Sequence, residues 1–318
     1  MIRRLCSLLA CIAIWLLLPT TVFAQPLPVK TVDFDSPAVG RKLKYNIVLP
    51  AKYEQGTQRY PVLYLLHGLS GNYTNWAGMG VPTYARNYDM IVVMPDGGNA
   101  WYVNWAKSED GQKNNWEDCI AKDLVQHVDK TYRTIAKREG RAINGLSMGG
   151  FGGLTVGLRN PDLFCSIGSH SGAVAYAKQR ADAIKSGKAA KTAKAPDTKI
   201  NPKIGIEGFS SPAERTPKGT MFTTVEECDN NDPFKLVLKV AKDKMPHIYF
   251  DCGTEDGLIQ ANKDLAKLMM DNKITFTFGQ SPGAHNSAYW TREVAHSMAA
   301  QYALMQRYMT ASGSGKAK

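Results

Sequence analysis

The sequence predicts an α/β fold in which helices cover both faces of a mostly parallel central sheet. One observation is that short apolar runs, such as residues 62–66 and 91–94, lack polar residues at alternate positions. Strands that are buried on both faces have this pattern. A second observation is that segments with helical spacing separate these runs, and such alternation is typical of doubly wound sheets.

The expected elements follow one another along residues 25–318. Strands are expected where apolar and β-branched residues cluster, at residues 42–49, 61–66, 90–94, 141–144, 164–169, 247–251 and 274–278. Helices are expected at residues 116–132, 149–158 and 258–269, with a long last one from Trp290. In the first of these helices, Ile120, Leu124 and Val128 recur at every fourth position.

The composition is that of a globular domain. Of 318 residues, 44% are hydrophobic and 21% are charged, which excludes a disordered chain, a collagen and a coiled coil. The net charge of +11 is uneven, because residues 178–203 carry eight Lys or Arg residues against two Asp residues. The rest of the chain is only mildly basic, so we expect no nucleic-acid partner.

The first 24 residues predict a cleaved secretory signal. Arg3 and Arg4 supply positive charge, residues 5–18 form an apolar run, and a small-residue cleavage pattern ends at Ala24. The run is shorter than the roughly 20 apolar residues of a membrane span. We therefore expect cleavage after Ala24, no integral membrane span in the mature chain, and a secreted or periplasmic location. An uncleaved anchor and a lipoprotein signal ending at Cys11 are less favoured alternatives.

Export permits disulfides, and the mature chain keeps four cysteines. They are Cys119, Cys165, Cys228 and Cys252. Four cysteines allow three complete pairings, and buried free thiols are equally compatible with the sequence. None of the four lies in a C-x-x-C motif or beside a histidine cluster, so no metal site and no cofactor are expected.

Residues 176–231 break the alternation of strands and helices. The stretch is rich in Lys, Ala, Pro, Gly and Ser, and it contains no clear strand. Long insertions in compact domains often cover an active site, so one interpretation is a cap over the sheet. A solvated excursion without a role is the alternative interpretation.

Gly145-Leu146-Ser147-Met148-Gly149 is a G-x-S-x-G motif between an expected strand and an expected helix. This is the context of a nucleophile elbow, whose sharp turn needs glycines beside the serine. A phosphate-binding loop is the alternative, but the motif lacks the G-K-[ST] ending of such a loop. Ser147 is therefore expected to be a nucleophile, near the positive end of a helix dipole.

The oxyanion formed at such a serine needs two N–H donors. One is expected to be the backbone N–H of Met148, the residue after the nucleophile. The second should come from the loop after an early strand, where His67-Gly68-Leu69-Ser70-Gly71 follows residues 61–66, and we choose the N–H of Leu69. A plain turn would account for these glycines equally well.

A general base and its orienting acid should follow in the order serine, acid, histidine. His247, His285 and His296 lie far enough beyond the serine, and only His285 lies in a loop between the last expected strand and helix. The acid is expected after residues 247–251, where Glu255 and Asp256 are adjacent. Asp256 is favoured, because its shorter side chain orients an imidazole more rigidly, and Glu255 stays open as an alternative.

Together these motifs resemble the esterase D family of α/β-hydrolases, which includes tributyrin-type esterases, S-formylglutathione hydrolases, feruloyl esterases and mycolyltransferases. Five stretches between about residues 43 and 305 carry the resemblance: residues 66–71, Pro95-Asp96-Gly97-Gly98-Asn99, residues 145–153, Cys252-Gly253-Thr254-Glu255-Asp256, and Pro282-Gly283-Ala284-His285. The resemblance implies an α/β-hydrolase fold, Ser147, Asp256 and His285 as a triad, and Leu69 and Met148 as oxyanion donors. The Lys-rich stretch matches no motif of the family.

The sequence thus predicts an exported serine carboxylesterase acting on short-chain, aryl or sugar esters through an acyl-enzyme. The substrate would be a small-molecule or polysaccharide-linked ester. One alternative is an acyltransferase that moves the acyl group to a sugar or lipid alcohol. Another is a catalytically silent binding protein whose basic cap docks on an anionic polymer or membrane surface. The intact triad favours an enzyme.

Overall fold

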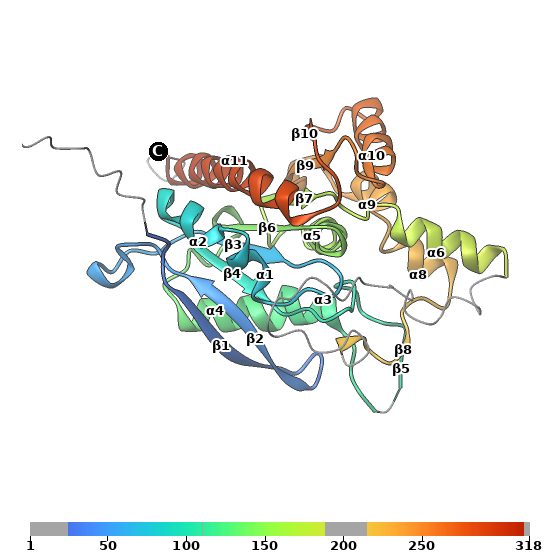
Figure 1. Cartoon of the computed structure of the whole chain (residues 1–318), viewed down its shortest axis with the longest axis horizontal. Coiled ribbons are helices and arrows are strands. Elements are labelled where there is room, and N and C mark those ends of the chain that lie inside the picture. The colour runs from blue at the N-terminus through green and yellow to red at the C-terminus, as the bar shows by residue number, and fades with distance from the viewer. Residues whose placement is uncertain (1–24, 110, 188–214, 315–318) are drawn as a thin grey trace, which may run out of the picture.

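The computed structural model describes residues 25–109, 111–187 and 215–314 (Figure 1). An eight-stranded sheet forms its centre, with the strand order β1-β2-β4-β3-β6-β7-β9-β10. These strands are β1 Val29–Ser36, β2 Arg41–Val48, β3 Val62–Leu66, β4 Ile91–Pro95, β6 Arg141–Gly145, β7 Ser166–His170, β9 His247–Gly253 and β10 Phe276–Ser281. β2 pairs antiparallel with β1 and β4, and all other neighbours pair parallel, which confirms the predicted sheet.

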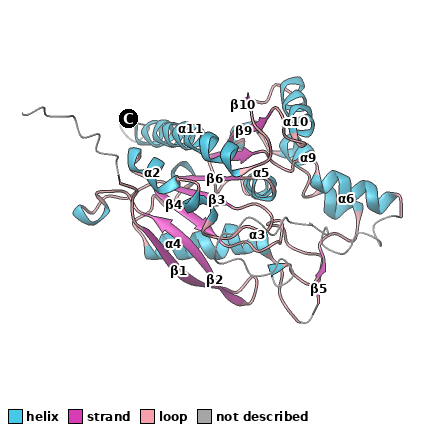
Figure 2. Ribbon diagram, viewed as in Figure 1, coloured by secondary structure: helices cyan, strands magenta, loops and turns pink. Residues whose placement is uncertain are grey.

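Helices cover both faces of this sheet (Figure 2). They are α1 Asn75–Gly78, α2 Val81–Tyr84, α3 Trp116–Asp118, α4 Val125–Thr131, α5 Met148–Arg159, α6 Tyr176–Lys185, α8 Val225–Asp229, α9 Pro233–Lys239, α10 Ile259–Asp271 and α11 Ser287–Ser314. Short helical turns are η1 Tyr53–Gln55, η2 Ala85–Asn87, η4 Arg138–Gly140 and η6 Lys242–Lys244, and the π-helical η3 Cys119–Leu124 joins α3 to α4.

The strands divide the core into two layers because successive side chains point to opposite faces. In β3, Val62, Tyr64 and Leu66 belong to the apolar layer that also contains buried residues of α4, α5 and α10. Leu63 and Leu65, on the other face, pack with α1, α2 and α11. Both layers are apolar, which explains why the central strands read as unbroken apolar runs.

Each of the seven expected strands is present, but β1 was not expected from the sequence. β1 lies at the edge of the sheet, and most of its side chains are exposed. An edge strand of this kind has no apolar run to reveal it. The expected helix at residues 116–132 is present as the continuous run of α3, η3 and α4.

The predicted cap is described only in part, since residues 188–214 lie outside the described residues. Its described parts are α6, α8 and the short strand β8 Gly219–Thr220, which pairs with β5 Lys107–Ser108. This short strand corrects the expectation that residues 176–231 contain none. The predicted signal at residues 1–24 also lies outside the described residues. Within the described ranges, no helix has the length and hydropathy to cross a bilayer.

The four cysteines of the predicted mature chain are free and buried. Burial raises the pKa of Cys119, Cys165 and Cys252 to about 12. It raises the pKa of Cys228 to about 11. These thiols therefore stay protonated at neutral pH and behave as small apolar side chains.

Candidate active site

Ser147 lies in the sharp turn between β6 and α5. Its φ of 53° is in the left-handed region, which few residues other than glycine adopt. A Cβ atom at Gly145 would lie 2.3 Å from the carbonyl oxygen of Gly149, and one at Gly149 would lie 2.4 Å from that of Leu66. Both glycines are therefore required by close backbone contacts, and they hold the serine at the carboxyl edge of the sheet.

The structure brings His285 and Asp256 to this serine from two other loops. His285 Nε2 lies 2.9 Å from Ser147 Oγ, and its Nδ1 lies 2.8 Å from Asp256 Oδ2. Asp256 follows β9, and His285 lies between β10 and α11. Glu255 is exposed, and its Oε1 accepts a hydrogen bond from Thr254 Oγ1 at 3.2 Å. Of the two acids left open by the sequence, Asp256 is the one that contacts the imidazole.

The Asp256 carboxyl is suited to stay ionised. Burial raises its pKa, but the hydrogen bonds from His285 and from the Leu258 N–H outweigh burial and lower the pKa below its ordinary value. The side chain is 1% exposed, whereas that of His285 is 36% exposed. The carboxylate accepts the Nδ1 proton, so the Nε2 lone pair faces the serine hydroxyl and can accept its proton.

Two backbone N–H groups, those of Met148 and Leu69, were expected from the sequence to serve as oxyanion donors. Met148 is the first residue of α5, where an N–H has no partner within the helix. The N–H of Leu69 has no hydrogen-bond partner among the described residues. A Cβ atom at Gly68 would lie 3.4 Å from the Cβ of Ser147, so the loop that carries Leu69 is packed against the serine.

His67 fixes the orientation of the peptide between Gly68 and Leu69. Its buried Nε2 accepts a hydrogen bond from the Gly97 N–H at 2.9 Å, so the ring proton is on Nδ1. Nδ1 lies 2.8 Å from the carbonyl oxygen of Gly68 and donates to it. In a trans peptide the carbonyl and the following N–H point in opposite directions, so this bond directs the Leu69 N–H away from His67. The sequence predicted that this loop supplies the Leu69 N–H, but it did not predict the contact by which His67 orients that group.

The loop after β4 supports the peptides on either side of this one. Tyr102 donates its hydroxyl proton to the carbonyl oxygen of His67 at 2.9 Å, and Asn99 Oδ1 accepts from the Ser70 N–H at 2.7 Å. Asp96 pairs with Arg215, which follows the undescribed part of the predicted cap. Burial raises the Asp96 pKa, whereas the Arg215 guanidinium and the hydrogen bond from the Gly98 N–H lower it.

The fold and this arrangement of side chains define an α/β-hydrolase. The model of the Esterase family matches residues 36–301, and the chain belongs to that family. This confirms the resemblance inferred from the motifs. Within the described ranges, no group of three or more His, Cys, Asp or Glu side chains is placed to share a metal ion.

Individual relatives agree with the family. Esterase MT1326 of Mycobacterium tuberculosis is 37% identical over 142 residues, which cover 44% of this chain and 31% of the relative. The chain thus matches less than a third of the length of that protein. The acetyl esterase of Caldicellulosiruptor saccharolyticus is 25% identical over 241 residues, covering 76% of this chain and 82% of the relative.

A solved structure shows the same fold. The fluorophosphonate-binding serine hydrolase FphF of Staphylococcus aureus superposes with a TM-score of 0.66 at 25% identity. The alignment covers 87% of this chain and 99% of that chain. The similarity therefore extends over almost all of both proteins.

Proposed function

We propose that the protein is an exported serine carboxylesterase with Ser147 as nucleophile, His285 as general base and Asp256 as the orienting acid. The observation that carries the proposal is that a partly exposed His285 contacts both Ser147 Oγ, at 2.9 Å, and Asp256 Oδ2, at 2.8 Å. Membership of the Esterase family and the serine hydrolase FphF support the same chemistry.

In the acylation step, His285 Nε2 takes the proton of Ser147 while Oγ attacks the ester carbonyl. The negative charge that forms on the carbonyl oxygen is stabilised by the N–H groups of Leu69 and Met148. Comparable sites lose about 3–4 kcal/mol of transition-state stabilisation when one such donor is removed. The imidazolium is stabilised by the Asp256 carboxylate and returns its proton to the departing alcohol.

In the second step, water attacks the acyl-enzyme. His285 takes a proton from the water, the same two N–H groups stabilise the second oxyanion, and the acid leaves as Ser147 Oγ recovers its proton. An acyltransferase would use the same acyl-enzyme with an alcohol in place of water. The products formed in the presence of an added alcohol distinguish these two reactions.

The substrate we propose is a short-chain, aryl or sugar ester, with the cap restricting its access. Aromatic packing near the nucleophile supports this. Phe151 lies one turn beyond Ser147 on α5, and its ring packs edge to face against Trp101. Trp101 stacks at 3.4 Å on Tyr176, the first residue of α6 in the proposed cap. A series of p-nitrophenyl esters of increasing chain length would test the proposal, and a preference for long acyl chains would contradict it.

The test of the activity is hydrolysis of p-nitrophenyl acetate by the parent protein and by Ser147→Ala. The substitution removes the attacking oxygen, so we expect kcat to fall by about 10⁴-fold or more. Ser186→Ala is the matched control, because this exposed serine at the end of α6 donates its hydroxyl proton only to backbone carbonyls. A Ser147→Ala variant with kcat close to that of the parent would contradict the proposal.

Export is proposed from the pattern of the first 24 residues. The exported protein is expected to begin at Gln25, which N-terminal sequencing of the extracytoplasmic fraction would detect. Recovery of a chain that still begins at Met1 would contradict cleavage.

A further inference from the structure

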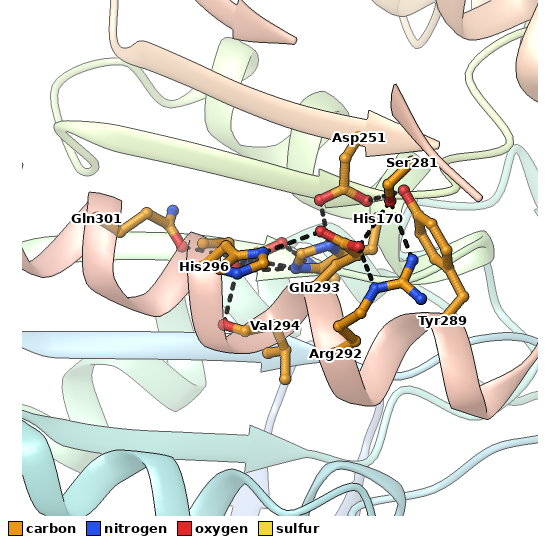
Figure 3. A network of polar contacts seen from close by, with 12 residues as sticks. His170, Asp251, Ser281, Tyr289, Arg292, Glu293, Val294, His296 and Gln301 are labelled. Carbon is orange, nitrogen blue, oxygen red and sulfur yellow. Dashed lines mark hydrogen bonds and ion pairs between the residues drawn. The ribbon is translucent and has the colours of Figure 1, made fainter. Parts of the chain in front are cut away.

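A second array of Asp, His and Ser side chains, which does not include the Ser147 hydroxyl, is built around His170 and Asp251 inside the protein (Figure 3). His170 Nδ1 lies 2.7 Å from Asp251 Oδ2, and its Nε2 lies 2.9 Å from Ser297 Oγ. Asp251 is 1% exposed, and His170 and Ser297 are fully buried. No substrate can reach this array, and burying so many polar groups is costly unless each is hydrogen-bonded.

One side of the buried array is joined to the nucleophile elbow through the backbone. The carbonyl oxygen of His170 accepts a hydrogen bond from the N–H of Ser147 at 2.9 Å. Asn144 lies in β6, three residues before Ser147, and its Nδ2 donates a hydrogen bond to Ser297 Oγ at 2.9 Å. Its Oδ1 accepts from the Gly145 N–H at 2.7 Å. The array therefore contacts the elbow at two points, at Asn144 and at the backbone N–H of Ser147.

The other side of the array is joined to the loop that carries His285. Asp251 Oδ1 accepts the hydroxyl proton of Tyr289 at 3.1 Å. The Tyr289 ring is packed against the backbone of Gly283, where an added Cβ atom would lie 2.6 Å from the ring. Gly283 is two residues before His285. One carboxylate oxygen of Asp251 is thus linked to the elbow through His170, and the other is linked to the His285 loop through the Tyr289 ring.

Two further side chains of α11 brace the start of the same loop. Glu293 Oε1 accepts the hydroxyl proton of Ser281 at 2.7 Å, and Arg292 Nη2 donates to the carbonyl oxygen of Pro282 at 2.7 Å. These contacts reach only the start of the loop. Tyr289 is the residue that links the loop to Asp251.

We propose that Asp251, His170 and Tyr289 form a positioning unit that sets the separation between Ser147 Oγ and His285 Nε2. None of the three touches the reacting atoms. The unit acts because Asp251 is linked through His170 to the N–H of Ser147 and through the Tyr289 ring to Gly283 in the loop that holds His285. The inference rests on the proposed function, in which these two atoms exchange a proton.

The decisive variant is Tyr289→Phe, which removes one hydroxyl and keeps the ring that packs on Gly283. Asp251→Asn would disturb the hub more strongly, but it also threatens the fold. We expect Tyr289→Phe to lower kcat for p-nitrophenyl acetate about tenfold with KM within about twofold, since small misplacements of reacting groups cost large factors in rate. Assays are run well below the unfolding temperature of each variant.

Tyr60→Phe is the matched control. The Tyr60 hydroxyl is also buried but has no hydrogen-bond partner among the described residues, and the ring packs on Tyr53 before β3, at the end of that strand opposite the loop that carries Leu69. We expect Tyr60→Phe to keep kcat and KM at parent values. A Tyr289→Phe variant that loses thermal stability but keeps the kcat of the parent would show a purely structural role and overturn the proposal.

Amide hydrogen exchange gives a second measurement that does not need activity. Tyr289→Phe is expected to speed exchange severalfold in residues 282–289 and 145–149, and Tyr60→Phe in neither. Unchanged exchange in both segments would overturn the positioning unit even in an active enzyme. A parent protein that hydrolyses no ester would instead contradict the proposed function, and the exchange result would still decide whether the unit couples the two segments.

Discussion

The two Asp-His-Ser arrays of this protein have nearly the same contact distances but differ in solvent access and in the backbone around the serine. In one, His285 lies 2.9 Å from Ser147 Oγ and 2.8 Å from Asp256. In the other, His170 lies 2.9 Å from Ser297 Oγ and 2.7 Å from Asp251. Distances alone therefore do not distinguish a reactive serine from a structural one.

Access and surroundings make the difference. His285 is partly exposed, and Ser147 is held in a left-handed backbone conformation next to Met148, whose N–H has no partner within α5. Ser297 lies in the middle of α11, where the surrounding backbone N–H groups are used within the helix. Its hydroxyl is within 3.1 Å of the Val294 carbonyl, as is common for serines inside helices. A serine in that setting has no donors for an oxyanion.

The sharpest test of this comparison is the same substitution in both histidines. His285→Gln removes the general base, so kcat for p-nitrophenyl acetate should fall by about 10⁴-fold or more. His170→Gln keeps the catalytic groups and disturbs only their support, so kcat should fall by about tenfold. A His285→Gln variant that kept a tenth or more of the parent kcat would contradict the claim that His285 is catalytic and His170 only supporting.

The oxyanion donors give the next largest effect. A Cβ atom at Gly68 would lie 2.5 Å from Leu146 Cδ1, so Gly68→Ala should displace the loop that carries the Leu69 N–H. We expect kcat to fall by about 10²-fold with a smaller change in KM. Gly78→Ala is the control, because nothing lies within 4 Å of a Cβ atom there. Equal kcat values for Gly68→Ala and Gly78→Ala would contradict the proposal that the Leu69 N–H stabilises the oxyanion.

The smallest effect concerns the acid of the accessible array. The pKa of Asp256 is lowered in the folded state, so its contribution to stability is present above the unfolded value of about 3.9 and is lost as pH falls through the folded value. The urea midpoint of the parent should therefore fall more steeply below pH 4 than that of Asp256→Asn. Glu255→Gln changes an exposed side chain, so the urea midpoint of this variant should fall with pH as that of the parent does. Parallel curves for the parent and Asp256→Asn would contradict an ionised, hydrogen-bonded Asp256.

Much of the fold follows from local sequence patterns. The central strands are buried on both faces, so runs such as residues 62–66 mark them clearly. The edge strand β1 pairs on one side only and exposes most of its residues, so the same criterion misses it. The fold class depends on the central strands, and it could be predicted without β1.

The candidate site was predictable to the extent that each residue lies in a loop at a known place in the chain order. Ser147, Asp256 and His285 each follow an expected strand, and the structure brings them together. Asp251 and His170 lie inside strands and follow no such rule. Their pairing depends on the register of β7 against β9, in which His170 is opposite Asp251, and the sequence does not encode that register locally.

The most direct test of the account is to find which serine reacts with a fluorophosphonate. After reaction, tandem mass spectrometry should find one adduct, on the peptide that contains Ser147, and no adduct on the peptide that contains Ser297. The adduct should be absent from Ser147→Ala. A stable adduct on any other serine, with Ser147 unmodified in active protein, would contradict the assignment of the accessible array as the catalytic one.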